Sequence, residues 1–126
     1  MKYLLGLFFI SITLIGCSSE AEIEFRSMST ADAYELITSG EDDVIILDVR
    51  SEDEFLGGHI AGSILLPVNE IEDRAESVLP DKDATILVIC QSGNRSQVAA
   101  QELVDLGFTN VYNIGGIMSW PGEIVQ

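Results

Sequence analysis

The sequence is poor in positive charge. Its 126 residues include 6 Lys and Arg against 21 Asp and Glu, and the formal net charge is −15. Binding to nucleic acid needs clustered Lys and Arg that neutralise phosphates, and electrostatic docking on an anionic membrane surface needs a basic patch. The composition therefore argues against both kinds of partner. With 47% hydrophobic side chains, the chain is instead typical of one globular domain of ordinary size.

Histidine and cysteine are also scarce. The chain has one histidine, His59, and two cysteines, Cys17 and Cys90. Because a protein metal site usually takes three or four Cys, His or carboxylate ligands, we expect no metal site, and nothing in the sequence indicates a cofactor. The two cysteines are far apart in the sequence and form no Cys-x-x-Cys motif, which excludes a dithiol oxidoreductase.

The N-terminal apolar run is too short to cross a membrane. It covers residues 3–15, after Lys2, whereas a spanning helix needs about 20 residues, and it is typical of a signal-peptide core. The Gly16-Cys17 step that follows resembles a bacterial lipoprotein processing site. The resemblance implies that residues 1–16 are removed and that Cys17 carries the lipid. The alternative is an ordinary secretory signal, or a buried apolar strand with an incidental cysteine.

On the lipoprotein interpretation, residues 17–24 form the lipidated N-terminus and a short polar tether, and residues 25–126 form the exported domain. The domain would be anchored to a bacterial membrane, in the periplasm or at the cell exterior. Cys90 would then have no disulfide partner within the chain. An unpaired cysteine is unusual in an exported protein and indicates a reactive thiol.

Strand-like and helix-like patterns alternate along residues 25–126. Apolar runs predict buried strands at residues 44–47 and 85–89, and shorter strands are predicted at residues 25–27, 63–66 and 111–114. Capping signals and helical spacing predict helices that start after Ser29 and Ser51 and others at residues 68–78 and 96–106. In the last helix, Val98, Ala99, Leu103 and Leu106 are expected to face inward. This alternation favours an α/β fold with a parallel sheet covered on both faces.

Cys90 ends the strongest predicted strand, and a short polar loop leads from it into a helix. In open parallel sheets, sites form at the carboxyl ends of strands. Backbone N–H groups of such a loop converge on one point, and the helix dipole adds positive potential there. A thiolate at that point is stabilised, so we expect a lowered pKa for Cys90. Gly93 permits the turn, Arg95 adds a positive charge, and Ser96 is expected to cap the helix.

With these residues in view, the chain resembles the single-domain rhodaneses, which are sulfurtransferases. Three blocks carry the resemblance: residues 48–50 with 54–55 and 58–63, the loop 90–96, and residues 107–111 with Gly115-Gly116 and Trp120. It implies a five-stranded parallel sheet with helices on both faces. It also implies that Cys90 takes sulfur from an anionic donor such as thiosulfate, becomes a persulfide, and gives the sulfur to cyanide or a thiol.

The resemblance implies roles for the residues around Cys90 as well. Backbone N–H groups of Gln91, Ser92, Gly93, Asn94 and Ser96 would hold the sulfur and the anionic donor, and Arg95 would orient the loop and attract the anion. Related phosphatases have a loop one residue longer, which weakens a phosphatase interpretation.

Residues outside the loop are expected to support it. Asp48 and Arg50 are interpreted as an ion pair that braces the loops, and His59 as structural, because a thiolate of low pKa needs no general base. The acidic clusters, including residues 52–54, are expected to form solvated faces. Two alternatives to an enzyme stay open: a non-catalytic persulfide carrier, or a module that binds a protein partner, for instance a protein that accepts sulfur.

Overall fold

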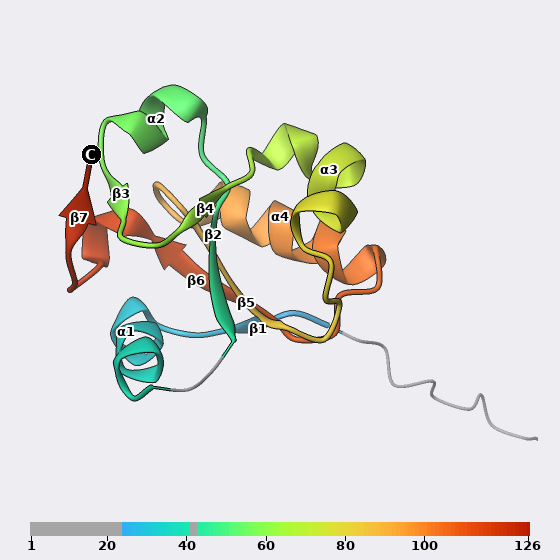
Figure 1. Ribbon diagram of the computed structural model, residues 1–126, viewed down its shortest axis with the longest axis horizontal. Coiled ribbons are helices and arrows are strands. Elements are labelled where there is room, and N and C mark those ends of the chain that lie inside the picture. Colours follow the sequence, from blue (N-terminus) through green and yellow to red (C-terminus); the bar gives the residue numbers. More distant parts are fainter. Residues whose placement is uncertain (1–23, 41–42) are drawn as a thin grey trace, which may run out of the picture.

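The computed structural model describes residues 24–40 and 43–126, which form a five-stranded parallel sheet with helices on both faces (Figure 1). The strand order is β1-β6-β5-β2-β4. The strands are β1 (Arg26–Ser27), β2 (Val44–Asp48), β4 (Ile64–Leu65), β5 (Thr85–Cys90) and β6 (Val111–Gly116). This architecture confirms the predicted fold class. Residues 1–16 and Cys17, to which the signal peptide and the lipid were assigned, lie outside the described residues.

The described residues form four α-helices, two of which begin at capping signals that the sequence carries. They are α1 (Thr30–Thr38), α2 (Glu52–Leu56), α3 (Ile71–Val78) and α4 (Asn94–Asp105), with 3-10 turns η1 (Val68–Glu70) and η2 (Ile117–Ser119). The Ser29 hydroxyl accepts a hydrogen bond from the Asp32 N–H and so caps α1. Ser51 and Glu54 form a reciprocal capping box at α2. None of the helices in the described part of the chain has the length and apolar character needed to cross a membrane.

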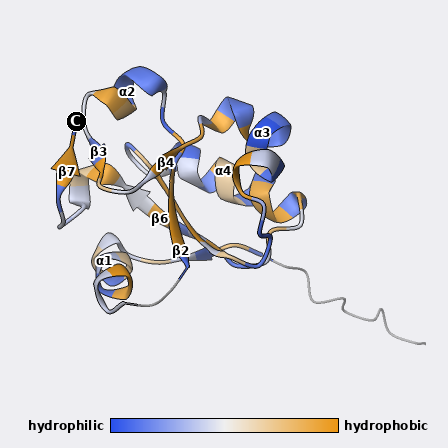
Figure 2. Ribbon diagram, viewed as in Figure 1, coloured by the Kyte–Doolittle hydropathy of each residue, from blue (hydrophilic) through white to orange (hydrophobic). Residues whose placement is uncertain are grey.

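The central strand β5 divides the core into two halves. Ile86, Val88 and Cys90 point to the face covered by α3 and α4, whereas Leu87 and Ile89 point to the face covered by α1. All five side chains are fully buried, and burial of each aliphatic one contributes about 1.5–3 kcal/mol. Figure 2 shows apolar colour along β2 and β5 and polar colour on the outer surfaces of α2 and α3. The two-sided burial explains why β5 is an uninterrupted apolar run.

Several elements differ from the sequence prediction. A two-stranded antiparallel sheet, β3 (His59–Ile60) with β7 (Ile124–Val125), was not predicted, because two-residue strands carry no periodicity. The helix predicted at 68–78 is a 3-10 turn followed by α3, and α4 begins at Asn94 rather than Ser96. Val98 was expected to face inward but is 53% exposed. The inner face of α4 is instead formed by Ser96, Ala99, Ala100 and Leu103.

Candidate active site

Cys90 is the last residue of β5, at the carboxyl edge of the parallel sheet. Its side chain is fully buried, and residues 91–93 form the turn that joins it to α4. The turn depends on Gly93, whose φ of 99° lies in the left-handed region that other residues avoid. This places Cys90 directly before a helix N-terminus, as the sequence predicted.

The expected capping role of Ser96 is wrong. Gly93 is the residue that precedes α4, and no side chain caps the helix there. Ser96 lies inside the first turn, where its hydroxyl is 3.0 Å from the carbonyl oxygen of Gly93. Because the left-handed glycine turns the chain early, the helix starts before Ser96, and this brings the Ser96 hydroxyl close to the cysteine instead.

The Cys90 sulfur sits among hydrogen-bond donors. The Gly93 N–H donates to Sγ at 2.9 Å, and the Ser96 Oγ lies 3.4 Å from Sγ. Burial raises the pKa of the Cys90 thiol, but hydrogen bonds from the Ser96 hydroxyl and from the N–H groups of Ser96, Gly93 and Ser92 lower it further than burial raises it. The net result is a pKa below the ordinary value, and therefore a larger thiolate fraction near neutral pH.

The Ser96 hydroxyl is positioned by the neighbouring strand. Its Oγ lies 2.7 Å from Asn113 Oδ1, and the same oxygen accepts a hydrogen bond from the Gly115 N–H at 3.0 Å. The Ser96 hydroxyl thus donates to Asn113 Oδ1 or to the Gly93 carbonyl and accepts from the Cys90 thiol; when Cys90 is a thiolate, the sulfur becomes a third acceptor for the same proton. Asn113 was not predicted as part of the site. It is 17 residues from Ser96 in the chain, and only the pairing of β5 with β6 brings the two together.

Gly116 keeps the loop in place by having no side chain. It is the register partner of Cys90 on β6. A Cβ at this position would collide with the backbone carbonyl of Gln91 and crowd Ser92. The sequence shows Gly115-Gly116 as a pair, but the need for a glycine at 116 follows only from this close approach of two backbones.

Arg95 is held by Glu54 of α2. Its two terminal nitrogens donate to the two carboxylate oxygens, Nη1 to Oε1 at 2.6 Å and Nη2 to Oε2 at 2.8 Å. The guanidinium holds the pKa of Glu54 down, to about 2, with the N-cap residue Ser51 contributing. Hydrogen bonding to Glu54 in turn raises the pKa of Arg95. The expectation that residues 52–54 form a solvated face is therefore wrong for Glu54.

Asp48 and Arg50 form a buried ion pair beneath the loop. Arg50 Nε and Nη2 donate to the Asp48 carboxylate, with a closest distance of 2.7 Å, and both side chains are almost fully buried. The same guanidinium reaches Gln91 Oε1 at 3.3 Å and the Gly58 carbonyl at 2.8 Å. The pair therefore ties the end of β2 to the cysteine loop and to the turn after α2. Removing one partner of such a pair costs about 3–5 kcal/mol.

The remaining loop residues contribute mainly through their backbones. The side chains of Ser92 and Asn94 are exposed, and that of Gln91 is half-buried. His59 stands apart from this arrangement. Its ring stacks on Phe55, with centroids 3.7 Å apart, and its Nδ1 lies 2.9 Å from the Phe55 carbonyl oxygen.

A buried cysteine surrounded by N–H donors, at the carboxyl edge of a parallel sheet and before a helix, defines a rhodanese-like enzyme. The chain belongs to the Rhodanese-like domain family, whose profile matches residues 29–123.

Curated and solved relatives agree with this assignment. The chain is 38% identical over 108 residues to thiosulfate sulfurtransferase GlpE of Pseudomonas entomophila, covering 82% of this chain and 94% of that protein. It is 35% identical over 71 residues to thiosulfate sulfurtransferase PspE of Escherichia coli, covering 56% of this chain and 68% of that protein. Among solved structures, a rhodanese-related protein from Thermoplasma volcanium is similar with a TM-score of 0.69 and 38% identity, covering 80% of this chain and 98% of that chain.

Proposed function

We propose that this protein is a sulfurtransferase that carries sulfane sulfur as a persulfide on Cys90. The observation that carries the proposal is the set of polar groups around the sulfur: the Gly93 N–H donates to Sγ at 2.9 Å, and the Ser96 hydroxyl, 3.4 Å from Sγ, lowers the pKa of Cys90. These donors favour the thiolate, which is the nucleophilic form. The names of the relatives, thiosulfate sulfurtransferases, support thiosulfate as a donor.

In the first half-reaction the Cys90 thiolate attacks the outer sulfur of thiosulfate. The new S–S bond forms on Cys90 as the S–S bond of thiosulfate breaks, and its electron pair leaves with sulfite. Negative charge develops next to the loop, where the Gly93 N–H already donates to the cysteine sulfur and the N–H groups of Ser92 and Ser96 also favour the thiolate. Such preorganised donors stabilise the transition state without rearrangement.

In the second half-reaction a thiophilic acceptor, cyanide or a thiolate, attacks the outer sulfur of the persulfide. The S–S bond to Cys90 breaks, and the electron pair returns to Cys90 as the thiolate. The loop donors that stabilise the resting thiolate therefore also favour its departure. Because donor and acceptor react in turn at one sulfur, the steady-state kinetics should be ping-pong.

The transfer of sulfur from thiosulfate to cyanide tests this function, with residues 24–126 compared with the Cys90→Ser variant. We expect thiocyanate formation that is lost in the variant. Equal rates in both proteins would refute the nucleophile. A protein that takes up one sulfur on Cys90 but does not pass it to cyanide would instead be a persulfide carrier.

We also propose that the enzyme is exported and anchored to a bacterial membrane through lipid on Cys17. The support is the sequence alone: a thirteen-residue apolar run followed by Gly16-Cys17. Two or more acyl chains would give stable anchoring. The mass of the mature N-terminal peptide tests this proposal, because cleavage anywhere other than before Cys17 contradicts it.

A further inference from the structure

A hollow of about 370 Å³ opens beside the cysteine loop. It lies between α2, the turn after it, η2 and β7, and Gln91 connects it to the active-site loop. Its lining residues are Arg50, Asp53, Glu54, Gly57, Gly58, Gln91, Ile117, Met118 and Ile124. Gln91 follows Cys90 directly in the chain, so the hollow adjoins the first residue of the active-site loop.

The hollow has apolar side chains that are exposed to solvent. Of its lining residues, Met118 is 82% exposed and Ile124 is 46% exposed. Met118 contacts the loop, since its sulfur lies 3.2 Å from Gln91 Nε2. A small sulfur donor has no use for this apolar surface. Exposed apolar side chains gathered at a site mark contact with a larger partner.

The rim is also negatively charged. Asp53 lines the hollow, and Glu52 and Glu123 adjoin its walls in the sequence, all three exposed. The two guanidinium groups nearby are neutralised, Arg50 by Asp48 and Arg95 by Glu54.

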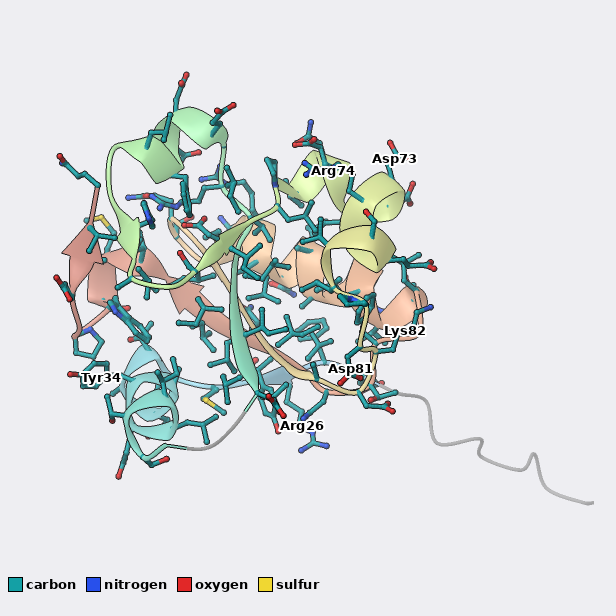
Figure 3. All side chains as sticks on the ribbon, in the orientation of Figure 1. Arg26, Tyr34, Asp73, Arg74, Asp81 and Lys82 are labelled. Atoms are coloured by element: carbon teal, nitrogen blue, oxygen red, sulfur yellow. The ribbon has the colours of Figure 1, made fainter. Side chains whose placement is uncertain are left out.

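The other basic side chains lie elsewhere on the molecule. In the described part of the chain these are Arg26, Arg74 and Lys82, and Figure 3 shows them well away from α2 and β7. A partner that balances the negative charge of the rim must therefore carry basic side chains of its own. A second copy of this chain has the same acidic rim and is repelled.

We propose that this hollow is the docking surface for a sulfur-accepting protein, which presents a cysteine flanked by an apolar side chain on a basic surface. The proposal rests on the proposed persulfide chemistry at Cys90. The acceptor thiolate attacks the outer sulfur of the Cys90 persulfide, a new S–S bond forms on the acceptor, and the old bond breaks with its electron pair on Cys90. The acceptor leaves as a persulfide, so no further oxidant or reductant is needed.

The test uses protein first loaded with sulfur by thiosulfate, with loading verified by intact mass. Two cysteine peptides of equal length then serve as acceptors, one with four Lys and one with four Glu placed at least three residues from a shared Leu-Cys-Gly core. We expect the Lys peptide to remove sulfur at least tenfold faster at low ionic strength, and the ratio to shrink at 0.5 M salt. Equal rates for the two peptides would overturn the proposal, whereas failure to load would overturn the proposed function instead.

Charge variants separate local docking from the net charge of −15. Asp53→Asn should reduce the rate with the Lys peptide about threefold. Asp73→Asn, which removes the same charge from α3 on the far side of the molecule (Figure 3), should not change it. An equal decrease in both variants would show that the peptide responds to overall charge, and would contradict a docking surface at the hollow.

Replacing exposed apolar residues with serine tests whether the acceptor makes an apolar contact at the hollow. Met118→Ser should slow transfer to the Lys peptide about threefold, and replacing the core Leu of that peptide by Ser should remove most of this difference. Val98→Ser is the matched control, because Val98 is also exposed, at 53%, but on α4. A loss of similar size with Val98→Ser, or none with Met118→Ser, would overturn the apolar contact.

Discussion

Glu54 binds Arg95 through both oxygens of its carboxylate, at 2.6 and 2.8 Å. The ion pair joins α2 to the first turn of α4, beside the cysteine loop. In the resting enzyme both terminal nitrogens of the guanidinium are therefore occupied. Arg95 stays close enough to Cys90 for their charges to interact, but Glu54 balances its positive charge, so an incoming anion is attracted to it less strongly.

Glu54→Gln should strengthen binding of the anionic donor. The amide keeps an oxygen that accepts a hydrogen bond from Arg95 but removes the competing negative charge. We expect the KM for thiosulfate to fall about three- to tenfold with little change in kcat. Steady-state kinetics measure this, with Glu52→Gln on the same helix as the control of equal charge. A higher KM in Glu54→Gln would mean that Glu54 serves to orient Arg95.

The same ion pair makes stability depend on acid pH. The pKa of Glu54 is about 2 in the folded protein and 4.5 without the pairing, so its contribution is complete above pH 4.5 and is lost as the pH falls toward 2. Urea unfolding at pH 7 should show Glu54→Gln less stable than the parent by about 1 kcal/mol, as for a partly exposed pair. At pH 2 the two proteins should be equally stable. A difference that persists at pH 2 would contradict the assigned pair.

Ser96→Ala should raise the pKa of Cys90. The variant removes the hydroxyl that stabilises the thiolate, and a hydrogen bond to a charged group is worth about 1.5–3 kcal/mol. We expect the rate of persulfide formation at pH 7 to fall roughly tenfold, with its pH profile shifted to higher pH. Thiolate absorbance titrated against pH measures the pKa directly. Ser92→Ala keeps the N–H that acts on the sulfur and should leave that titration unchanged; a shift of equal size in both variants would be contrary to this assignment.

Gly116→Ala should disturb activity more than stability. Its Cβ would push on the Gln91 carbonyl, and a loop displaced by about 1 Å can lose on the order of 100-fold in rate. Gly62→Ala is the comparison, because Gly62 has a φ of 80° but free space around it. That variant should lose about 1 kcal/mol of stability and keep its rate. Full sulfur transfer by Gly116→Ala would show that the loop tolerates the displacement.

The sequence was sufficient for the fold class and for the position of Cys90. The continuous apolar run of β5 and the capping residues Ser29 and Ser51 are local features of the sequence, and the folded structure agrees with them. Contacts between distant segments were not predictable in this way. Glu54 belongs to an acidic cluster that looks solvated, and only the packing of α2 near α4 brings it to Arg95. Asn113 and Gly116 acquire their roles from the register of β6 against β5.

The role of Ser96 was also not predictable from the sequence, although it depends on a residue only three positions away. Its residue type and its place after a loop favoured a capping role, but the left-handed φ of Gly93 starts the helix earlier. A shift of two residues in a helix boundary turned an expected cap into a hydrogen-bond partner of the cysteine.

Intact-mass measurement after exposure to thiosulfate tests the central claim most directly. Residues 24–126 should gain the mass of one sulfur atom, located by peptide mapping at Cys90, and should lose it again when cyanide is added. Cys90 is the free cysteine in the described part of the chain, so Cys90→Ser should gain nothing. A parent protein that gains no sulfur, or a Cys90→Ser variant that gains as much as the parent, would contradict the persulfide mechanism.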